Sequence, residues 1–428
     1  MKPIKSLVLT SAIVAGLSST AFANTLAKVY IAGAPAIRQD ANANLAAYVG
    51  TFSGSGVTAT SGPTAGASDV QSASQNQWLI PNFATGVDLE INASWTGNTA
   101  GFESVASGVV TQKFIADGTG SIATPSVLQT NTTAYQPDFA LGDTFQNSTP
   151  FHGTVTELGP TSTTSFTHTY AAVSVLQLGV EPYKFVASPG ATAAGLTNIT
   201  TAQAQNLYEN GVLPLSFFTG NNSDEGTLVY GLTRDGGSGA RLVALAETGI
   251  GVKSVITTYK PTVTGGTVDS SGNYVNGTIT DAYNAVNPYP AGLIPSTGIW
   301  DVNAGDTGYA KFGSPSVNVG LLQAITATPP SGALFVTYLN DADGTEATAA
   351  GAVTLTYNGV TETAANVNEG KYTFWSYQGI DIAPATYSGS SNASTVAHYL
   401  NAHWTATFPK ANLNVYRNGD GGTIIQNF

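Results

Sequence analysis

The sequence predicts an α/β protein of two lobes built on a mostly parallel β-sheet. Segments typical of strands alternate with segments typical of helices, and glycine-containing turns join them. The length of 428 residues exceeds that of an ordinary single domain and indicates two lobes. The apolar run from Ala171 to Leu178 is typical of a strand buried on both faces of a parallel sheet.

The first 23 residues have the form of a secretion signal. Two lysines precede an apolar run at 7–17, and Ala21-Phe22-Ala23 is a small-residue cleavage site. The apolar run is too short to span a bilayer, and no later segment approaches a span. We therefore expect a mature protein that begins at Asn24 and is periplasmic or secreted.

The net charge and the absence of cysteine exclude several kinds of partner and chemistry. The chain has no cysteine, which excludes disulfides, thiol catalysis and a lipid-modified N-terminal cysteine. Without residues 1–23, which hold Lys2 and Lys5, 12 basic residues face 26 acidic ones, a net charge of −14. Such a surface argues against nucleic acid and anionic membranes as partners. The negative charge does not exclude a small anion as ligand, because a buried site can bind it with local dipoles and one arginine.

The first part of the chain predicts strand-turn-helix units. Residues 28–32 form a strand, residues 33–36 a turn, and apolar residues at helical spacing follow as far as Tyr48. Residues 87–95 alternate as a strand and lead through a glycine turn into a helix with Thr99 as N-cap. A short apolar strand over 138–144 carries Asp143 near its end, and strands over 171–178 and 183–187 follow.

The clearest helix lies within residues 196–211. Thr200 and Gln203 form a capping box, and Gly211 ends the helix. A strand over 227–233 follows, and then a glycine turn and a second helix, with Ser238 as N-cap and Gly249 as C′ residue.

The later part of the chain is richer in turns. Residues 259–300 predict hairpins or a long insertion, and residues 341–367 form a second insertion of unassigned role. Residues 340–344 resemble the opening of a calcium loop, but its closing bidentate Glu is missing, so a hairpin turn is expected. Further strands are expected over 308–312, 333–339, 353–357 and 371–377, a helix over 394–404, and strand with a turn over 413–428.

Arginine is rare and concentrated. Two of the four arginines, Arg234 and Arg241, flank the glycine turn that leads to Ser238. A helix N-terminus with free amides, a capping hydroxyl and a guanidinium suits an oxyanion. An ordinary surface turn with Arg234 as a solvated charge is the alternative, and the stretch alone favours neither.

Four strand-to-turn junctions could build one site. Ligands of α/β sheets lie beyond the carboxyl ends of strands, often against helix N-termini. The junctions at 33–36, 96–101, 142–144 and 234–240 could therefore meet and hold a tetrahedral anion with amides and hydroxyls.

The order and content of these junctions resemble the periplasmic phosphate-binding proteins of ABC importers, which have the two-lobed type 2 periplasmic binding fold. The resemblance implies one lobe of residues 24–149 plus 373–428 and a second lobe of residues 150–372, with β-rich insertions. It rests on Gly33 to Ala36, Thr96 to Gly101, Asp138 to Asp143, Leu196 to Gly211, Leu215 to Phe218, Arg234 to Ala240 and Lys371 to Trp375.

The resemblance also implies the ligand-binding residues. An aspartate that faces the anion accepts a hydrogen bond only from a protonated oxygen, so it would admit hydrogen phosphate and repel sulfate. This chain departs from the family pattern at Ala240, where a threonine is expected, and at Asp235, which follows the arginine directly. The first turn also lacks a hydroxyl. The implied set is Ala36, Thr96, Thr99, Asp143, Arg234, Ser238, Gly239 and Ala240.

We therefore expect a monomeric solute-binding protein for a small oxyanion, with phosphate as first choice, that delivers it to an ABC permease. The sequence contains no nucleophile elbow, phosphate-cradling loop or strong carboxylate pair, and His398 and His403 are badly spaced for zinc. Neither catalysis, a cofactor nor a metal is expected. One alternative is an extracellular structural or adhesive β-rich protein, suggested by the Gly, Ser, Thr and Asn content. Another is a sensor or scavenger without a role in transport.

Overall fold

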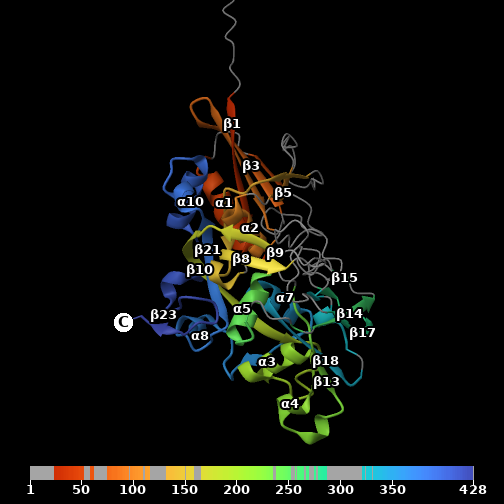
Figure 1. Ribbon diagram of the computed structural model, residues 1–428. Coiled ribbons are helices and arrows are strands. Elements are labelled where there is room, and N and C mark those ends of the chain that lie inside the picture. Colours follow the sequence, from red (N-terminus) through yellow and green to blue (C-terminus); the bar gives the residue numbers. More distant parts are fainter. Residues whose placement is uncertain are drawn as a thin grey trace, which may run out of the picture.

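Figure 1 shows the computed structural model of the chain. The predicted signal peptide, Thr96, most of the turn before Ser238 and the expected strand at 308–312 lie outside the residues that the structure describes. In the part that is described, no helix is both long and apolar enough to cross a membrane. The structure describes residues 24–427 except 53–57, 62–74, 96, 109–110, 116–131, 150, 159–164, 235–237, 252–255, 257, 265–266, 269–273, 276–277, 287–320, 323 and 330.

A large β-sheet runs through the molecule with helices packed around it, so the predicted α/β class is confirmed. Its strand order is β12-β13-β18-β10-β21-β7-β1-β4-β3-β2, and β19 and β22 pair with β10 beside this path. The bounds are β12 Val212–Pro214, β13 Leu228–Gly231, β18 Ala333–Asn340, β10 Ser174–Ala187, β21 Trp375–Ile382, β7 Phe139–Gly142, β1 Thr25–Gly33, β4 Val87–Ser94, β3 Gln75–Ala84, β2 Thr58–Ser61, β19 Val353–Thr354 and β22 Phe408–Pro409.

The sheet is mixed, so the prediction of a mostly parallel sheet is wrong. Parallel pairing joins β1 to β4 and β7, and β13 to β18, whereas the other strand pairs described in this sheet are antiparallel. The two parallel groups are separated by β10 and β21. Strand β10 is antiparallel to β18, and β21 is antiparallel to β7. Glycine turns and apolar runs in the sequence do not distinguish these two directions.

Strand β10 links the two ends of the sheet. Residues 174–182 pair with β21, while residues 183–187 pair with β18. The two strands expected over 171–178 and 183–187 are therefore one long strand. Residues 174–178 are only half-buried, so the expected burial of this run on both faces is also wrong.

Two hydrophobic cores lie on either side of this link. One holds Ile31, Leu89 and Trp95 with apolar residues of α1 (Arg38–Gly50) and α10 (Asn392–His403). The other holds Phe185 and Tyr338 with residues of α3 (Thr201–Asn210) and α5 (Gly239–Glu247). The remaining helices and 3-10 turns are α2 Asn98–Ser107, α4 Ser216–Thr219, α7 Asp341–Ala349, α8 Ala364–Asn368, α9 Pro384–Tyr387, η1 Gln146–Ser148, η2 Asn222–Asp224 and η3 Lys410–Asn412.

Two of the predicted helix starts are confirmed. In α3 the Thr200 hydroxyl accepts from the Gln203 amide at 3.2 Å, and the Gln203 side chain accepts from the Thr200 amide at 2.9 Å, as a capping box requires. Ser238 caps α5, and Gly249 follows it with a φ of +75°.

The predicted N-cap of α2 is wrong. Gly97, not Thr99, caps the helix, and Thr99 is its second residue. The amide of Gly97 donates to the carbonyl of Gly33 at 3.2 Å, which fixes the turn against the end of β1. The first intrahelical bond, from Gly101 to Gly97, follows from this position.

Residues 340–344 form the start of helix α7, not a hairpin turn. The Asn340 side chain accepts from the Asp343 amide at 3.1 Å and caps the helix. An Asn followed by acidic residues is a good helix start, because both satisfy or complement the free amides of the first turn. The acidic residues of the stretch that resembles a calcium loop therefore stabilise the start of helix α7.

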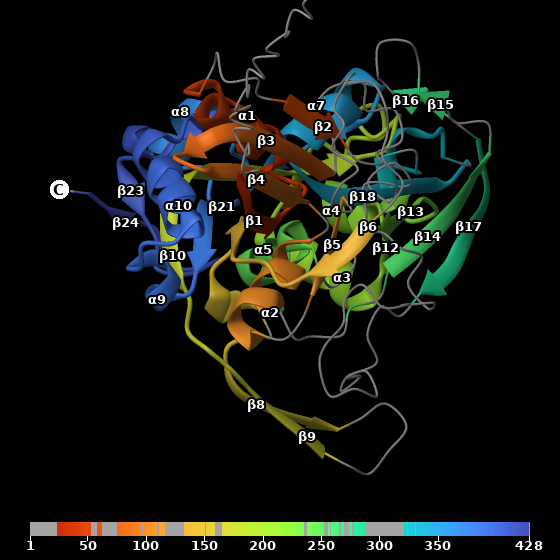
Figure 2. The same cartoon turned by 90° about the horizontal axis from the view of Figure 1, so that it is seen from above.

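Short hairpins extend from the main sheet. Pairing of β14 (Thr258–Thr264) with β17 (Thr278–Val286), and of β15 (Thr267–Val268) with β16 (Tyr274–Val275), confirms hairpins in the described part of 259–300. Figure 2 shows the hairpin of β8 (Gly153–Leu158) and β9 (Ser165–Tyr170) projecting from the body. The other two-stranded pairs are β5 Gln112–Ile115 with β6 Thr132–Tyr135, β11 Asn198–Ile199 with β20 Thr356–Tyr357, and β23 Val415–Tyr416 with β24 Ile425–Gln426.

Candidate functional site

The candidate site lies where several strands end. β1, β4 and β7 are parallel neighbours, so their carboxyl ends meet at one edge of the sheet. Ala36, the turn before α2 and Asp143 follow these three ends. β13 and β18 form the second parallel pair, and Arg234 and α7 follow their ends. Such an edge is where α/β folds present polar groups to ligands.

Asp143 and the start of α5 are in direct contact. A β-carbon on Gly239 would overlap Asp143 Oδ1 and stand 2.6 Å from Asp143 Cγ. Only glycine permits the carboxyl group to approach the helix N-terminus so closely. The structure thus brings together two residues that lie 96 positions apart in the sequence.

The Asp143 carboxyl group is buried, and its surroundings favour its protonated form. Its side chain is 1% exposed, and neither carboxylate oxygen has a hydrogen-bond partner among the described residues. Burial raises the pKa of Asp143 to about 7; the Tyr183 hydroxyl and Arg234 lower it, and Asp420 raises it further. The group can therefore accept or donate a hydrogen bond near neutral pH.

A second buried carboxyl group lies behind Asp143. Asp381 is fully buried on β21, and a β-carbon on Gly142 would overlap its Oδ2 atom. Burial raises the pKa of Asp381 well above its usual range, and the charges of Asp143 and Asp420 raise it further. Among the described residues, no cation contributes to this shift, so its surroundings favour the protonated form of Asp381.

Asn98 fixes the backbone at Asp143. Its Oδ1 atom accepts from the Asp143 amide at 3.1 Å, and its Nδ2 group donates to the Thr144 hydroxyl at 2.5 Å. Asn98 is the first residue of α2 and is 1% exposed. It thereby ties the N-terminal end of α2 to the loop after β7. Thr99, the next residue, is fully buried in the same turn of helix.

Arginines from different parts of the chain act electrostatically on the buried carboxylates. Arg234, 5% exposed, lies near enough to Asp143 to lower the pKa of that group. Burial raises the pKa of Asp343, in the first turn of α7, and the charges of Arg234 and then Arg38 lower it. Asp343 thus lies within reach of an arginine after β13 and another after β1.

The loop after β1 contacts the start of α7. The Asn340 side chain donates to the carbonyl of Ala36 at 3.1 Å. Burial raises the pKa of Glu346, one turn further along α7, to about 7; the charge of Asp343 raises it and that of Arg38 lowers it. Ala36 therefore lies beside the start of α7, which carries Asp343, and its carbonyl is engaged by Asn340.

The N-terminal turn of α5 contributes amides more than side chains. The Ser238 hydroxyl accepts from the Arg241 amide at 3.4 Å, a long bond that caps the helix. Ala240 is 2% exposed and packs in the core, so only its amide is available for a ligand. Ser238 is itself 6% exposed.

The predicted set is therefore partly assembled in the described residues. Asp143 touches Gly239, Arg234 lies near Asp143, and Ser238 and Ala240 flank Gly239 in sequence. Ala36 is placed next to α7, Thr99 is in the turn of helix that begins with Asn98, and Thr96 lies outside the described residues.

The sequence interpretation missed Arg38, Asn98, Asp343 and Asp420. Asn98 stands in the turn that was singled out, and its short amide side chain at a helix start was a usable signal. The acidic pair after Asn340 was interpreted as a turn, although the same residues fit a helix start. Arg38 and Asp420 gave no signal, since contacts between residues this far apart are not visible in one sequence.

Comparisons with known proteins find distant structural similarity and no match in sequence. No family model matches the sequence, and no curated protein sequence matches it. Among solved structures, a putative phosphate ABC transporter substrate-binding protein with bound phosphate from Clostridium perfringens is 9% identical, with a TM-score of 0.39 over 87% of this chain and 93% of that one. An ABC-type phosphate transport receptor from Vibrio cholerae is 11% identical, with a TM-score of 0.40 over 87% of this chain and 93% of that one.

A possible phosphate binding protein from Planctomyces limnophilus is 12% identical, with a TM-score of 0.34 over 88% of each chain. Similarity this distant does not decide what this chain binds, so the ligand has to be argued from its own residues.

Proposed function

We propose that this protein binds a small oxyanion, and phosphate in particular, at the edge of the sheet where Asp143 meets α5. The observation that carries the proposal is the contact between the buried carboxyl group of Asp143 and the N-terminal residue of a nine-residue helix, with Arg234 nearby. Helix amides and a guanidinium attract an anion, and a carboxyl group in their midst discriminates between anions by their protons.

The preference for phosphate follows from the buried carboxylate. When ionised, Asp143 can only accept a hydrogen bond, and hydrogen phosphate carries a proton to donate whereas sulfate does not. Sulfate has no proton to share with the Asp143 carboxylate. Its binding would place two anions side by side in a buried site, which costs several kcal/mol. The pKa near 7 means that this discrimination should strengthen from pH 6 to pH 8.5.

Binding, not chemistry, is the activity that these residues support. We infer a periplasmic or secreted receptor that hands its anion to an ABC permease, with one lobe of residues 24–149 plus 373–428 and another of residues 150–372. The two lobes would close over the ligand by a bend in the strands that connect them. A monomer suffices for this role.

Calorimetry of the mature protein with phosphate and with sulfate tests the proposal. We expect phosphate to bind and Arg234→Ala to abolish the binding, while Asp143→Asn reduces the preference for phosphate over sulfate at pH 8.5. Lys371→Ala is the control, because the exposed Lys371 pairs with the exposed Glu369 at 2.5 Å. The absence of heat with either anion would defeat the proposal.

A further inference from the structure

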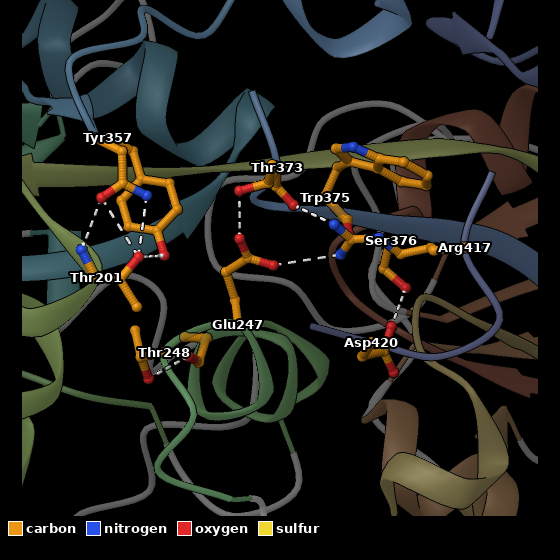
Figure 3. Close-up of polar contacts among 11 residues, drawn as sticks. Thr201, Glu247, Thr248, Tyr357, Thr373, Trp375, Ser376, Arg417 and Asp420 are labelled. Carbon is orange, nitrogen blue, oxygen red and sulfur yellow. Dashed lines mark hydrogen bonds and ion pairs between the residues drawn. The ribbon is translucent and has the colours of Figure 1, made fainter. Parts of the chain in front are cut away.

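The last part of the chain packs against both elements that form the Asp143–Gly239 contact. Residues 413–427 follow η3, form the β23–β24 pair and contribute Leu413 and Val415 to the core that contains α5. Between the two strands lies a turn with Asp420 and Gly421. Figure 3 shows the contacts of Arg417 with Glu247 and Thr373, and that of Asp420 with Ser376.

Arg417 is a buried cation with several acceptors. Its guanidinium donates to the carbonyl oxygens of Trp375 at 2.9 Å and Thr373 at 2.7 Å. It also pairs with the Glu247 carboxylate at 3.4 Å and lies 4.4 Å from the centre of the Trp375 ring. The residue is 1% exposed, so these contacts replace most of the water around the guanidinium, although its Nε atom has no hydrogen-bond partner among the described residues.

Glu247 connects Arg417 to the candidate site. It is the last residue of α5, the helix whose first residue, Gly239, touches Asp143. Glu247 also accepts a short hydrogen bond from the Thr373 hydroxyl. A cation at a helix C-terminus complements the helix dipole, so Arg417 fixes the far end of α5 by both charge and hydrogen bonds.

Asp420 holds the other side of the contact. Its carboxylate accepts from the amide of Phe145, two residues after Asp143, at 2.9 Å. It also accepts from the Ser376 hydroxyl at 2.5 Å, and the Ser148 side chain bonds to it as well. The negative charge of Asp420 raises the pKa of Asp143. The next residue of the turn lies against α5.

Gly421 brings the turn onto the last turn of α5. Its φ is +63°, and a β-carbon there would overlap the carbonyl group of Ala246 and stand 2.7 Å from the Glu247 amide. Within five residues the chain therefore contacts the end of α5 and the loop that carries Asp143. These are the two elements whose relative position sets the site.

We propose that residues 417–421 position the anion site: Arg417 and Gly421 hold α5, and Asp420 holds the loop after Asp143. The charge of Asp420 also lies near enough to Asp143 to act on the pKa of that group. We call residues 417–421 the bracket. Its relevance to ligand binding rests on the proposed function. The bracket itself is a property of the ligand-free protein, so it can be tested independently.

The charge arm of the test uses Asp420→Asn, with Asp88→Asn as control, because Asp88 is a half-buried aspartate on β4 whose bonds are to Asn24 and Asn82. Carbon-13 NMR of the Asp143 carboxyl group in ligand-free protein measures its titration midpoint. We expect Asp420→Asn to lower the midpoint by about 0.3 to 1 pH unit and the control to leave it unchanged. If Asp420 acted on neither the charge nor the position of Asp143, the midpoint would stay unchanged.

A second variant, Arg417→Lys, tests the positioning of α5. It keeps the positive charge but loses the planar guanidinium that donates to two carbonyl groups. We expect the amide resonance of Gly239 to move, the Asp143 midpoint to stay, and phosphate to bind at least fivefold more weakly at pH 8.5, where Asp143 is ionised in every variant. If Asp420→Asn fails to fold, Ser376→Ala, which removes one donor to Asp420, is tested by the same Gly239 resonance.

The two proposals fail in different ways. A wild-type protein that binds no phosphate sinks the proposed function, while the Asp143 midpoint and the Gly239 resonance still test the bracket. The bracket is overturned if Asp420→Asn and Arg417→Lys both leave these two readouts where Asp88→Asn leaves them.

Discussion

The carboxyl group of Asp143 lies against the Cα atom of Gly239, so close that no β-carbon fits between them. One residue follows strand β7 and the other begins helix α5. Their contact joins the loop after the first parallel group of strands to the helix that follows β13. The position of each therefore constrains the other.

Gly239→Ala tests this contact directly. We expect the added methyl group to displace Asp143, to abolish phosphate binding and to lower the free energy of unfolding by about 1 to 3 kcal/mol. Gly50→Ala is the control, because Gly50 ends α1 with open space around it, and alanine there should be neutral or slightly stabilising. Urea denaturation and calorimetry on both variants give the comparison; equal behaviour of the two would contradict the contact.

The protonation of Asp143 predicts how stability depends on pH. Because its pKa is higher in the folded than in the unfolded chain, the folded state holds more protons between about pH 4 and pH 7. Stability should therefore fall as the pH rises through this window, by up to a few kcal/mol from this group. Asp143→Asn should reduce the fall.

Denaturation at pH 5 and at pH 8 measures both proteins. Asp381, Glu181 and Glu346, whose pKa values are also raised, contribute a fall of the same sign that remains in the variant. A slope in Asp143→Asn as steep as in the wild type would show that Asp143 titrates normally.

Asp343 should weaken anion binding by partly neutralising two arginines. Its carboxylate lies within the electrostatic reach of Arg234 and Arg38. Asp343→Asn should therefore strengthen phosphate binding severalfold, at a cost of about 0.3 to 1 kcal/mol in stability, since a first-turn carboxylate favours the helix. Calorimetry measures the affinity, and Asp224→Asn, in η2, is the control. Weaker binding would instead mean that Asp343 orients Arg234.

Lys184 should be important for stability. Its ammonium group pairs with Asp341 at 2.6 Å and Glu362 at 3.1 Å, and its side chain is 11% exposed. Lys184→Met leaves two largely buried carboxylates without their cation and should cost about 2 to 4 kcal/mol in urea denaturation. Lys371→Met breaks an exposed pair with Glu369 and should cost less than about 1 kcal/mol. Similar losses would refute this difference.

Local signals in the sequence predicted the elements well. Thr200, Gln203 and Gly211 predicted α3, and Ser238 and Gly249 predicted α5, because caps act over three or four residues. Strand direction was not predictable in this way, because it depends on how distant segments meet. The joining of two expected strands into β10 has the same origin.

The candidate site was predictable only in part. Arg234 and Ser238 stood out through the rarity of arginine and the glycine turn, and Asp143 entered through the resemblance. The contact of Asp143 with Gly239 and the approach of Asp420 arise from packing between segments more than 90 residues apart. A single sequence carries no record of such contacts.

The shared strand β10 has a consequence for unfolding. Residues 174–182 are bonded to β21 and residues 183–187 to β18, so separating either half of the sheet exposes polar backbone groups of the other. The halves should therefore melt together in one cooperative transition, although each has a hydrophobic core of its own.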